Sequence, residues 1–145
     1  MAAGTMTSGL LADALIRRGV RTKNVRRLFQ TAAYVLSAFC LWALRSLPLQ
    51  PMVAAGVLAA ALGAKSLGYA GFAANMSDIA PRQAGRVFGI CNTFGGLAGI
   101  VGVVFSGWLL DTGAGYGAVF DTMIFAYLGA ILLWNLLCSD KQQFA

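Results

Sequence analysis

Residues 75–110, NMSDIAPRQAGRVFGICNTFGGLAGIVGVVFSGWLL, form the stretch that decides the fold. The stretch opens with a short polar turn and then continues from residue 87 to residue 110 without a charged side chain. At about 1.5 Å per helical residue, such a run is long enough to cross a hydrocarbon core of about 30 Å. The sequence therefore predicts a membrane-spanning helix here.

Small residues recur every three or four positions along this run, which places them on one face of a helix. They are Gly85, Gly89, Asn92, Gly95, Gly96, Gly99, Gly102 and Ser106. A face without side-chain bulk lets another helix backbone approach closely, which is how membrane helices associate where the hydrophobic effect does not drive them together. We therefore expect Gly85, Gly89, Gly95, Gly99 and Gly102 to be helix-packing residues.

The composition of the whole chain indicates the same class of protein. Hydrophobic residues make up 59% and charged residues 11%, against about 25% charged residues in soluble domains. The chain has no histidine, and its three cysteines have neither metal nor redox spacing. No acid pair, phosphate-binding loop or cofactor fingerprint is present either. We expect an all-α integral membrane protein that is not an enzyme and holds no metal or cofactor.

Four complete spans are predicted, at about residues 28–45, 52–76, 87–110 and 118–138. Residues 1–16 are apolar but supply only about half the length of a span. We expect them to be the end of a helix whose beginning is missing, and the chain to be a fragment. All of residues 1–145 are assigned to one domain, the C-terminal part of a larger helical bundle.

Positive charge is concentrated at one place, residues 17–27, which carry Arg17, Arg18, Arg21, Lys23, Arg26 and Arg27. The stretch could be a patch for nucleic acid or anionic lipid, or a loop kept on the cytoplasmic side by the positive-inside rule. The apolar segments on both sides favour the loop and argue against a nucleic-acid partner. Grouping it with Arg82, Arg86 and Lys141 predicts a multi-pass protein with a cytoplasmic C-terminus, or the organellar equivalent.

The segment Gly9-x-x-x-Asp13-x-x-x-Arg17-Arg18-Gly19 is the first candidate motif. Its functional interpretation is a conformational latch, in which Asp13 faces the positive N-terminal end of a neighbouring helix and Gly9 allows close approach. The alternative is an ordinary charged helix end at the membrane surface. An i,i+4 pair contributes only a few tenths of a kcal/mol, about 0.2–0.5, so the spacing leaves both open.

The second motif is Asp78-Ile79-Ala80-Pro81-Arg82-x-Ala84-Gly85, followed by NTFGGLAGIVG at residues 92–102. This string resembles the anion:cation symporter branch of the major facilitator superfamily, which includes sialin and the vesicular glutamate, sodium–phosphate and plastid phosphate transporters. Residues 9–27 are similar to the family's loop between helices eight and nine, and weaker similarity reaches the tail. We assign Asp78 and Arg82 to the same latch as Gly9, Asp13, Arg17 and Arg18.

The resemblance implies part of a twelve-helix protein whose two six-helix bundles move small organic or inorganic anions by alternating access, with a proton or sodium as coupling ion. The chain would supply helices nine to twelve and the end of eight. Its partners would be the lipid bilayer and the N-terminal helices that are missing from it. Much of the family's anion recognition resides in those missing helices.

Polar side chains inside the predicted spans are costly there and tend to face cavities. Lys65, Tyr69, Asn92 and Thr93 are therefore the candidate substrate-binding residues. Lys65 could bind an anion or pair with a carboxylate of an absent helix. Asn92 and Thr93 could instead join helices by hydrogen bonds of about 0.6 kcal/mol, and Tyr69 could be a packing or interfacial residue. The alternative function is a small membrane interaction protein that packs on partner helices without transport.

Overall fold

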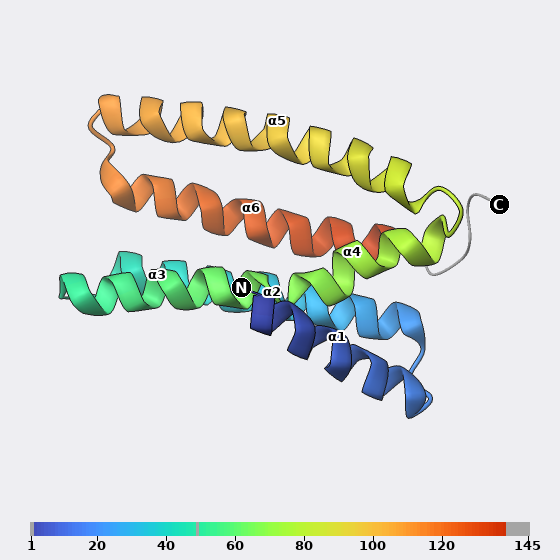
Figure 1. The fold of residues 1–145 in the computed structure, drawn as a ribbon. Coiled ribbons are helices and arrows are strands. Elements are labelled where there is room, and N and C mark those ends of the chain that lie inside the picture. The colour runs from blue at the N-terminus through green and yellow to red at the C-terminus, as the bar shows by residue number, and fades with distance from the viewer. Residues whose placement is uncertain (1, 49, 139–145) are drawn as a thin grey trace.

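The computed structural model describes residues 2–48 and 50–138, which fold into helices joined by short turns (Figure 1). The helices are α1 (Ala2–Arg17), α2 (Thr22–Ser46), α3 (Pro51–Lys65), α4 (Gly68–Ile79), α5 (Ala84–Asp111) and α6 (Gly115–Leu137). The described residues contain no strand. The predicted all-α class is confirmed.

Three of these helices, α2, α5 and α6, are long and apolar enough to cross a membrane by length and composition. Their ends follow local chemistry. Gly113 and Gly115 have φ values of 79° and 74° in the turn between α5 and α6, a conformation that glycine adopts without steric cost. Pro51 occupies the first turn of α3, where its missing N–H is not needed.

The basic stretch at residues 17–27 is less of a loop than predicted. Gly19, with φ 87°, ends α1, and the N–H groups of Gly19 and Val20 bond to the carbonyls of Ile16 and Leu15 at 2.9 and 3.2 Å. These two bonds form a Schellman motif. Because α2 already begins at Thr22, the last basic residues of the stretch lie on its first turns.

The predicted span over residues 52–76 is not one continuous helix, because the structure divides this region into α3 and α4 at Ser66 and Leu67. The Ser66 hydroxyl donates to the Gly63 carbonyl at 2.6 Å. The Ser66 and Leu67 N–H groups bond three residues back, to Gly63 and Ala64, at 3.0 and 3.1 Å. A serine that competes for a backbone carbonyl beside glycines is a known cause of a helix kink.

The helix break is braced by a serine from another helix. The Ser8 hydroxyl of α1 donates to the Ser66 carbonyl at 3.4 Å, and both side chains are buried. One turn earlier in α3, the Ser37 hydroxyl of α2 donates to the Ala61 carbonyl at 3.2 Å. Side-chain donors therefore hold α3 and the break against α1 and α2.

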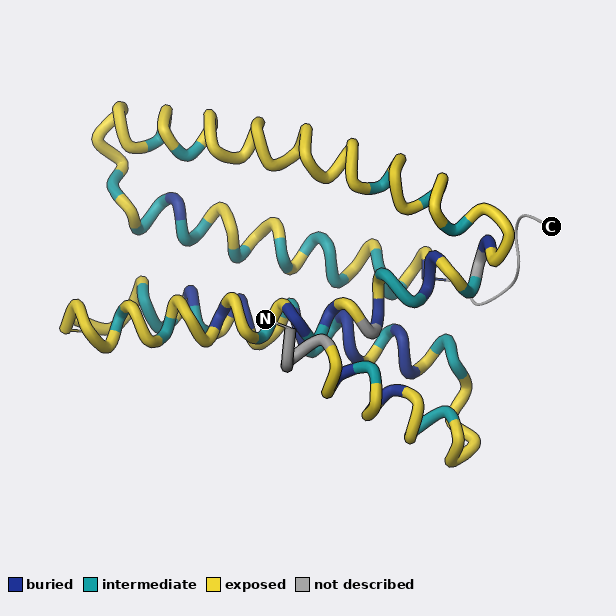
Figure 2. The backbone as a smooth tube through the Cα atoms, in the orientation of Figure 1, coloured by how far each residue is buried: buried dark blue, intermediate teal, exposed yellow. Residues whose placement is uncertain are grey.

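Helix α2 lies at the centre and packs on α3, α4 and α6, whereas α5 runs along the outside (Figure 1). None of the residues of α5 is buried, and Figure 2 shows the helix exposed along most of its length. An added Cβ would meet nothing within 4 Å at any of its predicted packing glycines, Gly85, Gly89, Gly95, Gly99 and Gly102. Their packing role stays a prediction, since no described helix covers them.

The connections sort to the two ends of the bundle. The α1–α2 and α4–α5 connections and the end of α6 lie at one end, and the α2–α3 and α5–α6 connections lie at the other (Figure 1). The charge pattern predicted this grouping, although Lys141 lies outside the described residues. The side of the membrane that each end faces stays a prediction.

Glycines of α4 bring its backbone unusually close to α2. A Cβ built on Gly71 would lie 2.8 Å from the Arg26 carbonyl oxygen and 2.8 Å from the Gln30 Cβ. One built on Gly68 would lie 3.0 Å from the Gln30 Oε1 atom. Real Cβ atoms do not approach backbone this closely, so only glycine fits at residue 71. A close contact between helix backbones at small residues therefore occurs between α2 and α4.

Among the described residues, two ion pairs join α2 to its neighbours. Arg26 Nε lies 2.9 Å from Asp78 Oδ2 of α4, with side chains 9% and 29% exposed, and Arg45 Nε lies 2.7 Å from Asp121 Oδ1 of α6, with side chains 46% and 40% exposed. The first pair is at the basic end and the second toward the opposite end. Since water screens exposed pairs, the Arg26–Asp78 pair is expected to contribute more.

Substitution of Gly71 by alanine is expected to destabilise the protein by about 1–3 kcal/mol, the usual cost of overpacking a close contact. The added methyl would push α4 away from the Arg26 carbonyl. The matched control is Gly56→Ala in α3, where nothing lies within 4 Å. It is expected to be neutral or stabilising by up to about 1 kcal/mol through helix propensity. Unfolding in mixed detergent micelles measures both, and equal effects would contradict the close contact.

The ion pairs supply a second comparison. Asp78→Asn removes the carboxylate that the largely buried Arg26 guanidinium contacts, and a loss of about 2 kcal/mol is expected, between the values for surface and buried pairs. Asp121→Asn is expected to cost less than about 1 kcal/mol. The same unfolding assay ranks them. A larger loss for Asp121→Asn would show that burial does not set the strength of these pairs.

Candidate functional site

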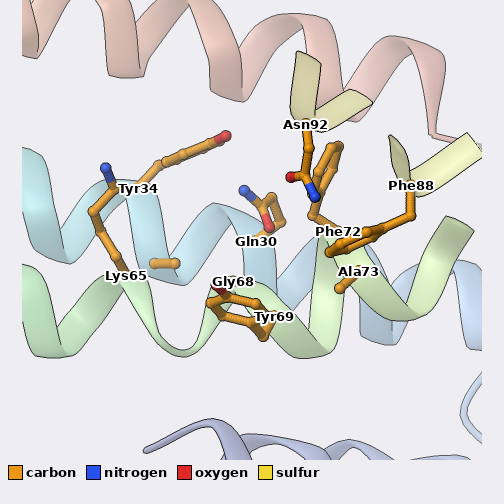
Figure 3. Close-up of a pocket in the computed structure, with 10 residues that line it drawn as sticks. Gln30, Tyr34, Lys65, Gly68, Tyr69, Phe72, Ala73, Phe88 and Asn92 are labelled. Atoms are coloured by element: carbon orange, nitrogen blue, oxygen red, sulfur yellow. The ribbon is translucent and has the colours of Figure 1, made fainter. Parts of the chain in front are cut away.

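A pocket of about 260 Å³ lies where α2, α3, α4 and α5 meet (Figure 3). Figure 3 shows Lys65 and Tyr34 toward one side of the pocket, Phe72, Phe88 and Asn92 toward the other, and Gln30 between them. The complete lining is Gln30, Ala33, Tyr34, Lys65, Gly68, Tyr69, Phe72, Ala73, Phe88 and Asn92. The helix break places Lys65 at the end of α3 and Tyr69 at the start of α4, so both reach this space.

Three of the four predicted substrate-binding residues, Lys65, Tyr69 and Asn92, line this pocket. Thr93 does not line it, and its hydroxyl donates to the Gly89 carbonyl of its own helix at 3.0 Å. Asn92 and Thr93 are neighbours in sequence, and consecutive helical residues point about 100° apart. The binding role of all four residues stays a prediction.

The Lys65 ammonium is held by aromatic side chains. Its Nζ atom lies 5.6 Å from the ring centroid of Tyr127 in α6, and that ring stacks on Tyr34 of α2 at 5.5 Å. A cation over an aromatic face is attracted by the ring quadrupole. Within the described part of the chain, Lys65 takes part in neither ion pair, and no acidic residue lines the pocket. Lys65 therefore lines the pocket without a carboxylate beside it among the described residues, and its ammonium lies over Tyr127, which is outside the lining.

Gln30 is a deeply buried polar group of the pocket, with 5% of its surface exposed, whereas Lys65 is exposed. Its Oε1 atom has no hydrogen-bond partner among the described residues. A buried acceptor without a donor costs about 1–3 kcal/mol. Sequence reasoning did not include Gln30, although the rule that singled out Lys65, a polar side chain inside an apolar span, applies to it equally.

Four aromatic side chains also line the pocket, those of Tyr34, Tyr69, Phe72 and Phe88. Phe72 is in turn packed against Trp134 of α6, with ring centroids 5.8 Å apart. Sequence reasoning missed Tyr34, Phe72 and Phe88 because an aromatic residue in an apolar span is ordinary packing material. Only the arrangement of the helices shows that these rings share one cavity.

The predicted latch residues are not gathered at one point. Asp78 pairs with Arg26, which was outside the predicted set. Asp13, Arg17, Arg18 and Arg82 are exposed, and within the described residues none of them is in an ion pair. A Cβ on Gly9 would meet nothing within 4 Å. The latch therefore stays a prediction.

Comparison with known proteins shows what this arrangement is related to. The chain is 33% identical to "Sodium-dependent phosphate transport protein 1, chloroplastic" of Arabidopsis thaliana, over 98% of this chain and 27% of that protein. It is 33% identical to the "Ascorbate transporter, chloroplastic" of the same organism, over 98% of this chain and 26% of that protein. Identity to the voltage-gated purine nucleotide uniporter of Mus musculus is 38%, over 96% of this chain and 30% of that protein.

No family model matches the chain. The chain spans about a quarter of the length of the curated relatives it matches. Those relatives are transporters by name, and three helices here are long and apolar enough to cross a membrane, so the chain is an integral membrane protein. The resemblance drawn from residues 75–102 is thus confirmed, and the chain is a homologue, over nearly its whole length, of the anion transporters of the anion:cation symporter branch.

Proposed function

We propose that this chain forms part of an anion transporter and supplies one wall of its anion-binding site. The observation that carries the proposal is that Lys65, which takes part in neither ion pair of the described residues, lines a pocket with no acidic residue among those described. A cation placed in this way attracts a carboxylate or phosphate group. The names of the relatives refer to phosphate, ascorbate and purine nucleotides, all of which are anions at neutral pH.

Each predicted binding residue then has a chemical role. Lys65 neutralises the charged group of the substrate, and the Tyr69 hydroxyl and the Asn92 amide donate hydrogen bonds to its oxygens. Charge-assisted hydrogen bonds of this kind are about twice as strong as neutral ones. The Thr93 hydroxyl bonds to the Gly89 carbonyl of its own helix. We therefore propose a structural role in α5 for Thr93 in preference to substrate contact.

The helix break supplies the movement that alternating access requires. Lys65 precedes it and Tyr69 follows it, so a change of angle between α3 and α4 changes the distance between these two residues. Half-helices that meet near a substrate are a recurring arrangement in transporters. The missing N-terminal helices would close the open side of the pocket, and a proton or sodium ion would be the coupling ion.

The basic end completes the proposal. Arg17, Arg18 and Arg82 face the cytoplasm, or its organellar equivalent, by the positive-inside rule, and the C-terminus lies on the same side. Together with Gly9, Asp13 and Asp78 they form a latch that engages helices of the first bundle. The exposure of Arg17, Arg18, Asp13 and Arg82 supports a partner outside this chain.

The second candidate function, a membrane interaction protein, is favoured by the uncovered glycine face of α5. A partner helix would then pack along Gly85, Gly89, Gly95, Gly99 and Gly102. The two candidate functions predict different results for anion binding to the pocket. The transporter expects anions to bind at Lys65, and the interaction protein expects no anion to bind.

The test measures anion binding to the whole chain in lipid nanodiscs by equilibrium dialysis, with labelled phosphate, ascorbate and ATP as probes. Lys65→Gln is expected to weaken binding of those that bind by about tenfold to a hundredfold, as the loss of a hydrogen bond to a charged group predicts. The matched control is Arg21→Gln, which changes the net charge equally. Arg21 is exposed in the turn before α2 and is not expected to alter binding.

Thermal unfolding of both variants checks that they fold alike. Equal binding by Lys65→Gln and Arg21→Gln would contradict a role for Lys65. Absence of binding for every probe would favour the interaction protein. If a probe binds, its uptake into proteoliposomes measures whether the chain transports it without additional helices.

A further inference from the structure

We infer that the substrate is an organic anion with a flat, unsaturated ring, whose charged group lies at Lys65 and whose ring packs on the aromatic side chains of the pocket. The inference rests on the proposed anion site and names its substrate class. It separates ring-bearing anions from inorganic oxyanions, although the names of the relatives refer to both kinds. Size, chemical character and rigidity of the lining support it.

The size of the pocket suits a small organic molecule. Its volume is about 260 Å³, close to the lower limit of about 300 Å³ for pockets that bind small organic ligands. A phosphate ion, with one central atom and four oxygens, fills little of that space. Much of the remaining lining is apolar or aromatic, from Ala33, Phe72, Ala73 and Phe88, and an oxyanion would lose hydration there without gaining a donor.

The lining has the character of a ring-binding surface. Four aromatic side chains reach it from three helices: Tyr34 from α2, Tyr69 and Phe72 from α4, and Phe88 from α5. Aromatic rings prefer offset-stacked or edge-to-face contacts with other flat rings. In Figure 3, Phe72 and Phe88 lie on the side of the pocket opposite Lys65. A ligand with its charge at Lys65 would therefore place its body toward these rings.

Two of the four rings are already fixed by partners in α6. Tyr34 stacks on Tyr127 with an interplanar angle of 27°, and Phe72 packs on Trp134 with an angle of 58°. Rings that are held before binding lose little side-chain entropy when the ligand arrives. Tyr127 also contacts the Lys65 ammonium, so α6 positions both the charge and the aromatic surface.

The buried Gln30 side chain indicates which substituent the ring of the ligand should have. Its Oε1 atom has no hydrogen-bond partner among the described residues, and it lies between the Lys65 side and the Phe72 side of the pocket (Figure 3). The terminal amide torsion is soft, so a small rotation turns the oxygen toward a ligand. A hydroxyl on the ring would supply the donor that Gln30 does not find among the described residues.

The experiment compares two acids that differ in the ring alone. 4-Hydroxybenzoate is flat, and trans-4-hydroxycyclohexanecarboxylate has the same charge and the same hydroxyl on a saturated ring. With the whole chain in lipid nanodiscs, isothermal titration is expected to give about fivefold tighter binding for the flat acid, the size of one aromatic contact. Inorganic phosphate is expected to bind more weakly than either acid.

Substitutions locate the preference. Phe72→Leu keeps an apolar side chain without a ring, and it is expected to weaken 4-hydroxybenzoate binding about fivefold while leaving the saturated acid nearly unchanged. Phe72→Tyr keeps the ring and should keep the preference, which separates loss of the ring from loss of folding. The matched control is Phe105→Leu in α5. Phe105 stacks on Trp108 at 5.7 Å, is outside this pocket, and should not change binding.

The outcomes separate this inference from the proposed function. If phosphate binds as tightly as 4-hydroxybenzoate and Lys65→Gln weakens both, the anion site stands and the ring preference is wrong. Equal affinity for the two acids, or an equal effect of Phe72→Leu and Phe105→Leu, also overturns the ring preference. If none of the three anions binds, the anion site itself fails and the inference fails with it.

Discussion

The close contact between α2 and α4 at Gly71 is the constraint on which the rest of this structure depends. Because residue 71 has no side chain, the α4 backbone lies directly on the Arg26–Gln30 turn of α2. That approach brings Asp78 within 2.9 Å of Arg26 and buries Gln30 against Gly68. It also sets the position of the first turn of α4, from which Tyr69 and Phe72 reach the pocket. The pocket exists because two backbones meet without side chains between them.

Much of the fold follows from hydropathy and length alone. The uncharged run at residues 87–110 lies within α5, and the charge pattern sorted the connections to the two ends that the structure shows. The break at Ser66 and Leu67 did not follow, because a single lysine beside a serine does not show whether a helix continues through it. Its cause is local hydrogen bonding by Ser66 beside Gly63, which an average over an apolar window does not register.

The spacing of the glycines predicts which helix face can be closely packed, but it does not predict which helix packs there. The regular series in α5 predicts a face able to receive a helix, yet no described residue covers it. Gly68 and Gly71, which have the close contact, are too few to form a series. A glycine series in one helix indicates only that another helix can approach that face closely. What it meets depends on helices elsewhere in the sequence or outside it.

The residues of the candidate site also fall into two groups, those that could be selected from the sequence and those that could not. Lys65, Tyr69 and Asn92 could be selected from the sequence because a polar group in a span costs free energy. The rings of Tyr34, Phe72 and Phe88 cost nothing there, so the sequence gives no reason to select them. Tyr127 comes from α6 and meets Lys65 only after folding. The cost of a polar side chain in a span can therefore be recognised for each residue from the sequence. A pocket surface made by rings from several helices depends on how the helices pack.

The unburied helix α5 has a consequence for how this protein responds to its lipid. The uncharged run of α5, residues 87–110, measures about 36 Å along the axis, longer than a hydrocarbon core of about 30 Å, so hydrophobic mismatch is relieved by tilting. Neighbouring helices normally fix such a tilt, but no residue of α5 is buried against the chain. Within this chain, bilayer thickness then contributes to the angle of α5 together with its contacts to α4 and α6. Since Phe88 and Asn92 belong to this helix, the thickness of the surrounding membrane becomes a determinant of the width of the pocket.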